Sequence, residues 1–187
     1  MRRIIVFENV TVDGYFAGLN GELDWAVRDE EVTQDSKEGQ GSTDLFLFGR
    51  VTYEMMASFW PTPAGMAANP VFAEALSNTS KIVFSKALMK SDWQHTKVMN
   101  EIDKDEILEL KHQPGKTIMI FGSRSIVNQL ASLGLIDGYQ LLVNPVVLGK
   151  GMPLFTEATE RFSLKLANAK VFKSGIVMLQ YEPGREE

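Results

Sequence analysis

The stretch 116–134, KTIMIFGSRSIVNQLASLG, decides the fold of this chain. It opens with an uninterrupted apolar run, residues 118–121, which predicts a strand buried on both faces. After a glycine, apolar residues recur at helical spacing as far as Gly134, a residue that suits the end of a helix. The stretch therefore predicts a strand, a glycine turn and a helix, which either Ser123 or Ser125 can cap.

The turn between that strand and helix, Gly122-Ser123-Arg124-Ser125, is suited to binding a phosphate. Glycine lets a ligand approach the backbone closely, and a helix N-terminus offers N–H groups and the positive end of a dipole. Arg124 adds a fork of hydrogen-bond donors. One such turn is also an ordinary connection in an α/β core, so the rest of the chain has to decide between these readings.

Composition limits the classes of protein to which the chain can belong. Its 187 residues, 44% hydrophobic and 23% charged, predict one soluble globular domain over 1–187. A net charge of −5 argues against nucleic acid or an anionic membrane as a partner. The absence of cysteine excludes disulfides and thiolate chemistry and is compatible with the cytoplasm, where we expect the protein. No stretch approaches the ~20 apolar residues of a membrane helix, and no signal peptide is recognisable.

Predicted strands and helices alternate along most of the chain. An exposed acidic helix is expected over 25–39, capped by Asp24, and a helix is expected over 51–58. The expected strands are residues 3–11, 44–48, 81–84, 93–99, 118–121 and 136–143, followed by a hairpin of 162–172 and 175–182. The alternation indicates an α/β fold with a largely parallel sheet, to which the hairpin adds antiparallel strands.

Polar segments directly follow three of the predicted strands: Gly49-Arg50, Ser85-Lys86 and the turn at 122–125. Ligands of open α/β sheets bind at the carboxyl ends of the strands, so we expect these segments to converge on one site. The loop 12–24 carries three glycines among aromatic residues. It is either a loop that closes over that site or a plain surface connection.

Four segments between Val10 and Phe155 resemble the dihydrofolate reductase-like family. Within it they are most similar to the reductase domain at the C-terminal end of bifunctional riboflavin-biosynthesis proteins (RibD) and its stand-alone bacterial relatives. The segments are VTVDGYFAG, LFLFGRVTYEMM, KIVFSKAL and IMIFGSRSIVNQLASLGLIDGYQLLVNPVVLGKGMPLF. The resemblance implies a three-layer fold with a central mixed, mostly parallel sheet, NADPH as hydride donor, and a homodimer.

The resemblance also implies a cofactor site made of three turns. The turn that meets the cofactor's phosphates would be Gly49, Arg50, Val51 and Thr52, and the position beside the 2′-phosphate would be Ser85 and Lys86. The pyrophosphate turn would be Gly122, Ser123, Arg124 and Ser125, with Ser123 replacing a glycine that is common in the family.

The chain departs from this family in two respects. True dihydrofolate reductases hold the pterin with an acid that follows a tryptophan on the first helix, but the acids near Trp25 have different spacing or type. Folate reduction is therefore in doubt. The deaminase half of the riboflavin protein, with its histidine-cysteine zinc motif, is absent.

The substrate side rests on fewer residues. Asp13, beside Gly14, either orients and protonates the substrate or stabilises the loop as an Asx turn. Tyr15, Asp24 and Trp25 are expected to line the substrate pocket. No paired histidines or clustered carboxylates suggest a metal site. Two functions remain: an NADPH-dependent reductase of a small pteridine- or pyrimidine-like heterocycle, or a nucleotide-binding relative without turnover.

Overall fold

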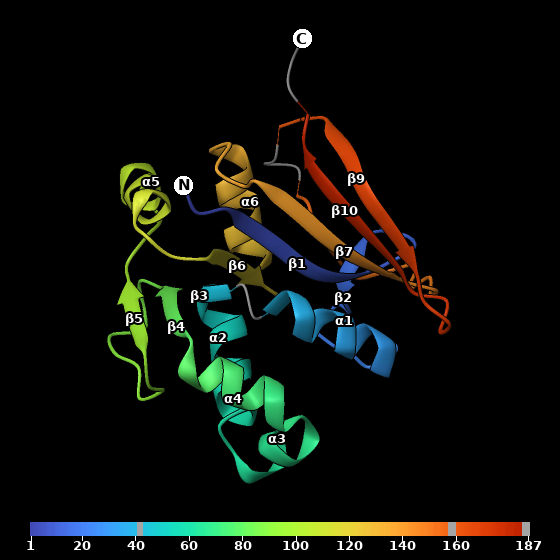
Figure 1. Ribbon diagram of the computed structural model, residues 1–187, viewed down its shortest axis with the longest axis horizontal. Helices are drawn as coiled ribbons and strands as arrows, with labels where there is room; N and C mark the ends of the chain where they lie inside the picture. The colour runs from blue at the N-terminus through green and yellow to red at the C-terminus, as the bar shows by residue number, and fades with distance from the viewer. Residues whose placement is uncertain (41–42, 157–159, 185–187) are drawn as a thin grey trace.

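The computed structural model describes residues 1–40, 43–156 and 160–184 (Figure 1). Within them, one eight-stranded sheet has the order β5-β4-β3-β6-β1-β7-β10-β9. Strands β5 to β7 of this order are parallel, whereas β10 is antiparallel to both β7 and β9. This confirms the predicted α/β fold with its C-terminal hairpin. The strands are β1 Ile4–Thr11, β3 Thr43–Gly49, β4 Ser80–Phe84, β5 Thr96–Met99, β6 Thr117–Phe121, β7 Gly138–Asn144, β9 Leu164–Val171 and β10 Val177–Pro183.

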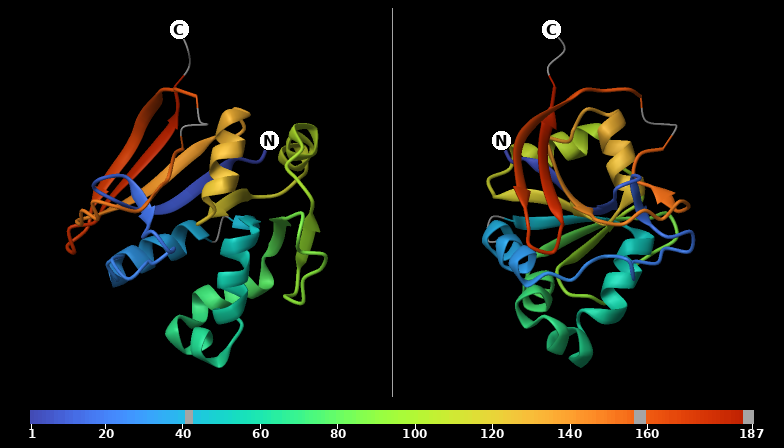
Figure 2. Two further views of the ribbon diagram at one scale, coloured as in Figure 1. Left: turned by 180° about the vertical axis from the view of Figure 1, so that it is seen from behind. Right: turned by 90° about the vertical axis from the view of Figure 1, so that its right-hand side faces the viewer.

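Helices cover both faces of this sheet (Figures 1 and 2). Helices α5 (Lys104–His112) and α6 (Arg124–Ser132) lie on one face. On the other lie α1 (Glu30–Gln40), α2 (Arg50–Phe59) and α4 (Pro70–Asn78), with the short α3 (Pro63–Ala68) beside α4. The result is the predicted three-layer arrangement.

The central strands are buried on both faces, as their uninterrupted apolar runs predict. In β3, Leu45 and Leu47 pack into the core beneath α5 and α6, and the alternating Phe46 and Phe48 pack into the core beneath α2 and α4. Gly134, with φ +66°, follows the last turn of α6 as the sequence predicts.

The first helix begins later than predicted. Helix α1 starts at Glu30, and Asp29 receives the N–H of Glu31 at 2.7 Å, the hydrogen bond that was expected from Asp24. Trp25 lies in a turn before the helix, where its indole Nε1 donates to the carbonyl of Glu22 at 3.0 Å. The prediction of a helix over 25–39 capped by Asp24 is therefore wrong at its start.

Two other predicted segments differ in their details. The loop 12–24 contains a short strand, β2 (Tyr15–Ala17), that pairs antiparallel with β8 (Met152–Pro153). We call residues 12–24 the flap. Strand β5 begins at Thr96 rather than at 93 because His95 has a φ of 58°, a left-handed conformation that a strand does not accommodate.

Candidate functional site

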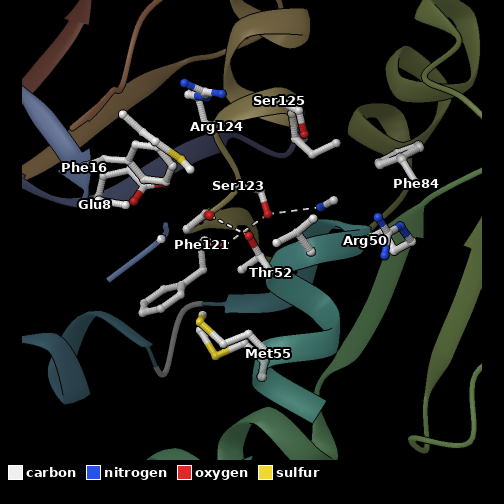
Figure 3. A pocket seen from close by; sticks show the side chains of 18 of the residues that line it. Glu8, Phe16, Arg50, Thr52, Met55, Phe84, Phe121, Ser123, Arg124 and Ser125 are labelled. Carbon is white, nitrogen blue, oxygen red and sulfur yellow. Dashed lines mark hydrogen bonds between the residues drawn. The ribbon is translucent and has the colours of Figure 1, made fainter. Parts of the chain in front are cut away.

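The sheet has a topological switch point between β3 and β6. These two strands are parallel neighbours, but the helix that follows β3 covers one face and the helix that follows β6 covers the other. Their N-termini therefore diverge and leave a crevice at the carboxyl ends of the strands, the usual ligand site of open α/β sheets. A cavity of about 790 Å³ lies there (Figure 3).

Two hydrogen bonds tie the turns on either side of this crevice together (Figure 3). The N–H of Gly49 donates to Ser123 Oγ at 3.0 Å, and Thr52 Oγ1 donates to the carbonyl of Gly122 at 2.6 Å. Ser123 occupies the N-cap position of α6, but its side chain makes no capping hydrogen bond. Its hydroxyl instead fixes the distance between the two helix N-termini.

The glycines of these turns leave space that a side chain would fill. A Cβ at Gly122, where φ is +65°, would lie 3.2 Å from Thr52 Cγ2, and a Cβ at Gly49 would lie 2.9 Å from Ser125 Oγ. Backbone can thus approach a ligand closely at two helix N-termini, where N–H groups and dipoles favour an anion. This cradle fits the phosphates of a dinucleotide cofactor.

Basic side chains from three elements line the same cavity. Arg50 forms an exposed ion pair with Glu54 at 2.7 Å, and Lys86 forms one with Glu101 at 3.3 Å. Exposed pairs of this kind contribute little, so either base can turn to a bound anion. Arg124 lies 5.8 Å from the ring centroid of Phe16 in β2, a cation–π contact that joins α6 to the flap.

Of the predicted cofactor residues, nine line the cavity and Ser85 does not. Ser85 is buried, and its Oγ accepts the N–H groups of Ala87 and Leu88 at 3.1 and 2.9 Å, which fixes the turn that carries Lys86. The nine are Gly49, Arg50, Val51, Thr52, Lys86, Gly122, Ser123, Arg124 and Ser125.

The predicted substrate residues lie outside the cavity lining. Asp24 is exposed, and Tyr15 packs against Gly151. The indole of Trp25 donates a hydrogen bond to the carbonyl of Glu22. The flap instead contributes its other residues, namely Phe16, Ala17, Asn20, Gly21 and Leu23.

Asp13 connects the flap to the segment that follows β7. Its carboxylate accepts the N–H groups of Leu148 and Gly149 at 3.2 and 2.8 Å, and the hydroxyl of Thr11 at 2.6 Å. The Thr11 hydroxyl first, and then the backbone donors, lower its pKa, so Asp13 is ionised at neutral pH. A catalytic role for Asp13 stays a prediction, and its position favours the loop-stabilising alternative.

Glu8 in β1 is a site residue that the sequence reading missed. It lines the cavity, is only 4% exposed, and its Oε1 has no hydrogen-bond partner among the described residues. Burial raises its pKa to about 8, and the backbone of Gly122 and Ser123 acts in the opposite direction. The signal in the sequence was an acid in the inward register of a buried strand, in line with Ile4 and Val6.

Aromatic rings form an apolar wall beside Glu8. Phe7 and Phe121, on neighbouring strands, stack with their centroids 5.5 Å apart, and both line the cavity. The cavity thus combines a polar cradle at two helix N-termini with an apolar wall and one buried acid.

Neither a metal cluster nor a membrane span is found in the part of the chain that the structure describes. No group of three or more histidine, aspartate or glutamate side chains is placed to hold a metal ion there. None of the helices there has the length and apolar character to cross a membrane.

Comparisons with known proteins identify the family and the fold of the chain. The uncharacterized protein YyaP of Bacillus subtilis (strain 168) is 33% identical over 180 residues, covering 96% of this chain and 94% of YyaP. A putative riboflavin biosynthesis protein from Shewanella sp. PV-4 shares the fold, with a TM-score of 0.73, 22% identity and coverage of 98% and 99% of the two chains. Dihydrofolate reductase from Enterococcus faecalis, complexed with NADP(H) and RAB-propyl, has a TM-score of 0.64, 15% identity and coverage of 98% and 97%. A sequence model of the RibD C-terminal domain matches residues 2–178, and the chain belongs to that family.

Proposed function

We propose that this protein is an NADPH-dependent reductase of a small heterocycle of pyrimidine or pteridine type. The observation that carries the proposal is the cavity at the switch point between β3 and β6, which has a phosphate cradle on one side and an aromatic wall on the other. Membership of the RibD C-terminal family and the fold shared with an NADP(H)-bound dihydrofolate reductase support a reductase. When bound, the cofactor supplies a hydride.

The chain's own residues bind the pyrophosphate and the 2′-phosphate of the cofactor. The turn at Gly122 and the first turns of α2 and α6 hold the phosphates through backbone N–H groups. Arg50 and Lys86 leave their exposed carboxylate partners to bind the 2′-phosphate, a dianion that suits charge-assisted hydrogen bonds. Ser85 supports this subsite by fixing the turn before Lys86.

The substrate's ring is held at the apolar wall. Phe7 and Phe121 supply a flat surface for a heterocycle, and Phe16 of the flap also lines the cavity (Figure 3). The flap is held by strand pairing between β2 and β8 and by the contact of Phe16 with Arg124. Closing it over the ring excludes water from the reacting atoms.

The experiment is a titration of the protein with NADPH and NADH, followed by NADPH absorbance in the presence of a panel of heterocyclic acceptors. Arg50→Ala should weaken NADPH by about 1.5 kcal/mol, the lower end for a charged hydrogen bond because this guanidinium is exposed, and leave NADH unchanged. Arg3→Ala is the matched control, since Arg3 forms a similar exposed pair with Glu182 at 2.7 Å away from the cavity. Equal affinity for the two cofactors would contradict the 2′-phosphate assignment.

The second candidate is a nucleotide-binding relative without turnover. The same titration separates the two functions, because that relative would bind NADPH but oxidise it with no acceptor of the panel. The presence in the cavity of a buried acid with one unpartnered oxygen favours the enzyme, since binding a nucleotide alone does not need that acid.

We further propose that the chain works in the cytoplasm as a homodimer of single-domain subunits. The edge strand β9 supports an assembly, because its Leu166 and Val171 are 51% and 73% exposed and an apolar edge needs cover. Light scattering that shows a monomer at micromolar concentration would contradict the dimer.

A further inference from the structure

Glu8 lines the cavity, but the proposed binding of the cofactor does not involve it. Phe7 pairs with Phe121 at the end of β6, so the next residue of β1 lies beside the Gly122 turn. Glu8 therefore stands where β6 has ended and the cavity begins (Figure 3). A carboxyl group at this depth with an unpartnered oxygen costs stability.

The surroundings of Glu8 favour its neutral, protonated form. Desolvation by burial is the largest influence on the carboxyl group, and no charged side chain contributes to its pKa shift. The other ionisable side chains that line the cavity are Arg50, Lys86, Glu101 and Arg124, and the first three are engaged in exposed ion pairs. A protonated carboxyl carries an O–H donor, and among the described residues Oε1 finds no partner for a hydrogen bond.

We propose that Glu8 is the proton donor of the reduction and that the substrate presents the heteroatom of a ring C=N or C=O bond to it. The proposal rests on the proposed function, which supplies the hydride. The hydride electron pair forms the new C–H bond, and the π pair of the double bond moves to the heteroatom. That atom takes the proton from the Glu8 carboxyl, so one O–H bond breaks and one N–H or O–H bond forms.

The turn next to Glu8 suits the carboxylate that this step leaves behind. The backbone of Gly122 and Ser123 favours the ionised form of Glu8, and the N-terminus of α6 directs its positive dipole end to the same place. Glu8 thus combines a buried environment that retains the proton with nearby donors that stabilise the charge after transfer. Water regains access when the flap opens, and the carboxylate is protonated again.

The test compares the wild type with Glu8→Gln, Glu8→Asp and Asp13→Asn. With the acceptor that the wild type reduces fastest, turnover should fall as the pH rises through about 8, since only the protonated acid can donate. Glu8→Gln should lower turnover about 10²- to 10⁴-fold and abolish this dependence, with NADPH affinity within twofold of the wild type. Glu8→Asp keeps an acid, so this variant should retain part of the wild-type turnover, and its turnover should still fall at high pH. In Asp13→Asn, turnover should fall with rising pH as it does in the wild type.

A readout without turnover accompanies the kinetics. Carbon-13 NMR of protein labelled at glutamate carboxyls should show one resonance that titrates near pH 8 in the wild type and is missing in Glu8→Gln. A wild type that oxidises NADPH while Glu8→Gln does so equally well, or a fall in turnover at high pH that disappears with Asp13→Asn instead, would overturn the role of Glu8 alone. A wild type that binds no NADPH would overturn the proposed function and this inference together.

Discussion

Buried ionisable side chains have charged partners at the amino ends of the parallel strands, whereas Glu8 at the carboxyl ends has none. At the amino ends, Lys111 is 4% exposed and pairs with Asp137 at 2.7 Å, while Asp137 also accepts the N–H of Ile4. Arg2 and Asp44 form a second ion pair at the same end. At the carboxyl ends, Glu8 is equally buried, but its Oε1 has no partner among the described residues.

This difference separates the part of the sheet that stabilises the fold from the part that lines the cavity, where we propose that ligands bind. A buried charge is tolerated where an opposite charge and hydrogen bonds compensate its desolvation, as at Lys111 and Asp137. Glu8 has no opposite charge beside it, and because desolvation by burial outweighs the backbone of Gly122 and Ser123, it avoids the cost by staying protonated. The amino ends should therefore respond to mutation through stability, and the carboxyl ends through ligand binding and pH.

The largest expected effect is on how stability depends on pH. The pKa of Glu8 is 4.5 in its ordinary state and about 8 in the folded protein, so between these values the folded state holds a proton that the unfolded state has lost. The free energy of unfolding should then decrease as the pH rises through this window, by at most about 5 kcal/mol at about 1.4 kcal/mol per pH unit. Glu8→Gln removes this contribution.

Urea unfolding of the wild type and Glu8→Gln at pH 4.5 to 9 measures the contribution of Glu8 to the free energy of unfolding. The difference between the two proteins should shift in favour of the variant as the pH rises, while the titrations of all other groups cancel in the comparison. A constant difference over the whole range would mean that Glu8 titrates at an ordinary pKa, and the contrast between the two ends of the sheet would fail.

The next effect concerns the paired end. Lys111→Met leaves Asp137 without its cation and should lower the free energy of unfolding by about 3 kcal/mol, the lower end for a broken buried pair because the Asp137 side chain is 28% exposed. Lys104→Met on the exposed start of α5 is the matched control and should change stability little. Chemical denaturation measures both, and NADPH affinity should be unaltered in each. A Lys111 variant as stable as the control would show that this pair does not stabilise the sheet.

The sequence predicts those features of the fold that are encoded in local patterns of residues. The apolar run of β3 and the glycine turns after β3 and β6 are encoded in adjacent residues, so the sheet and the turns that line the cavity follow from the sequence. The flap strand β2 has three residues and its partner β8 has two, which is too few for the alternation of apolar and polar residues in a strand to be visible.

The substrate side could not be predicted because it depends on contacts between residues far apart in the chain. Asp13 is held by Leu148 and Gly149, and no pattern around Asp13 indicates these donors. Glu8 becomes a cavity residue only because β1 pairs with β6 and continues past its end. Trp25 lies in a turn, since Asp29 rather than Asp24 caps the first helix.

The smallest effect tests whether the cradle needs an open backbone. Gly122 and Gly134 have nearly the same left-handed conformation, with φ of +65° and +66°, at opposite ends of α6. An alanine at either position should cost about 1–2 kcal/mol of stability through backbone strain alone. At Gly134 a Cβ would meet nothing within 4 Å, whereas at Gly122 it would crowd Thr52 Cγ2 at 3.2 Å and narrow the turn.

Gly122→Ala and Gly134→Ala should therefore lose similar stability and differ in ligand binding. Thermal unfolding measures the loss of stability in both variants, and a fluorescence titration with NADPH measures the difference in their NADPH affinity. We expect only Gly122→Ala to weaken NADPH, because its methyl group lies where the backbone approaches the phosphates. Equal NADPH affinity in the two variants would place the phosphates away from this turn. The cradle would then have to be sought at the first turn of α2, where Gly49 provides the other close approach.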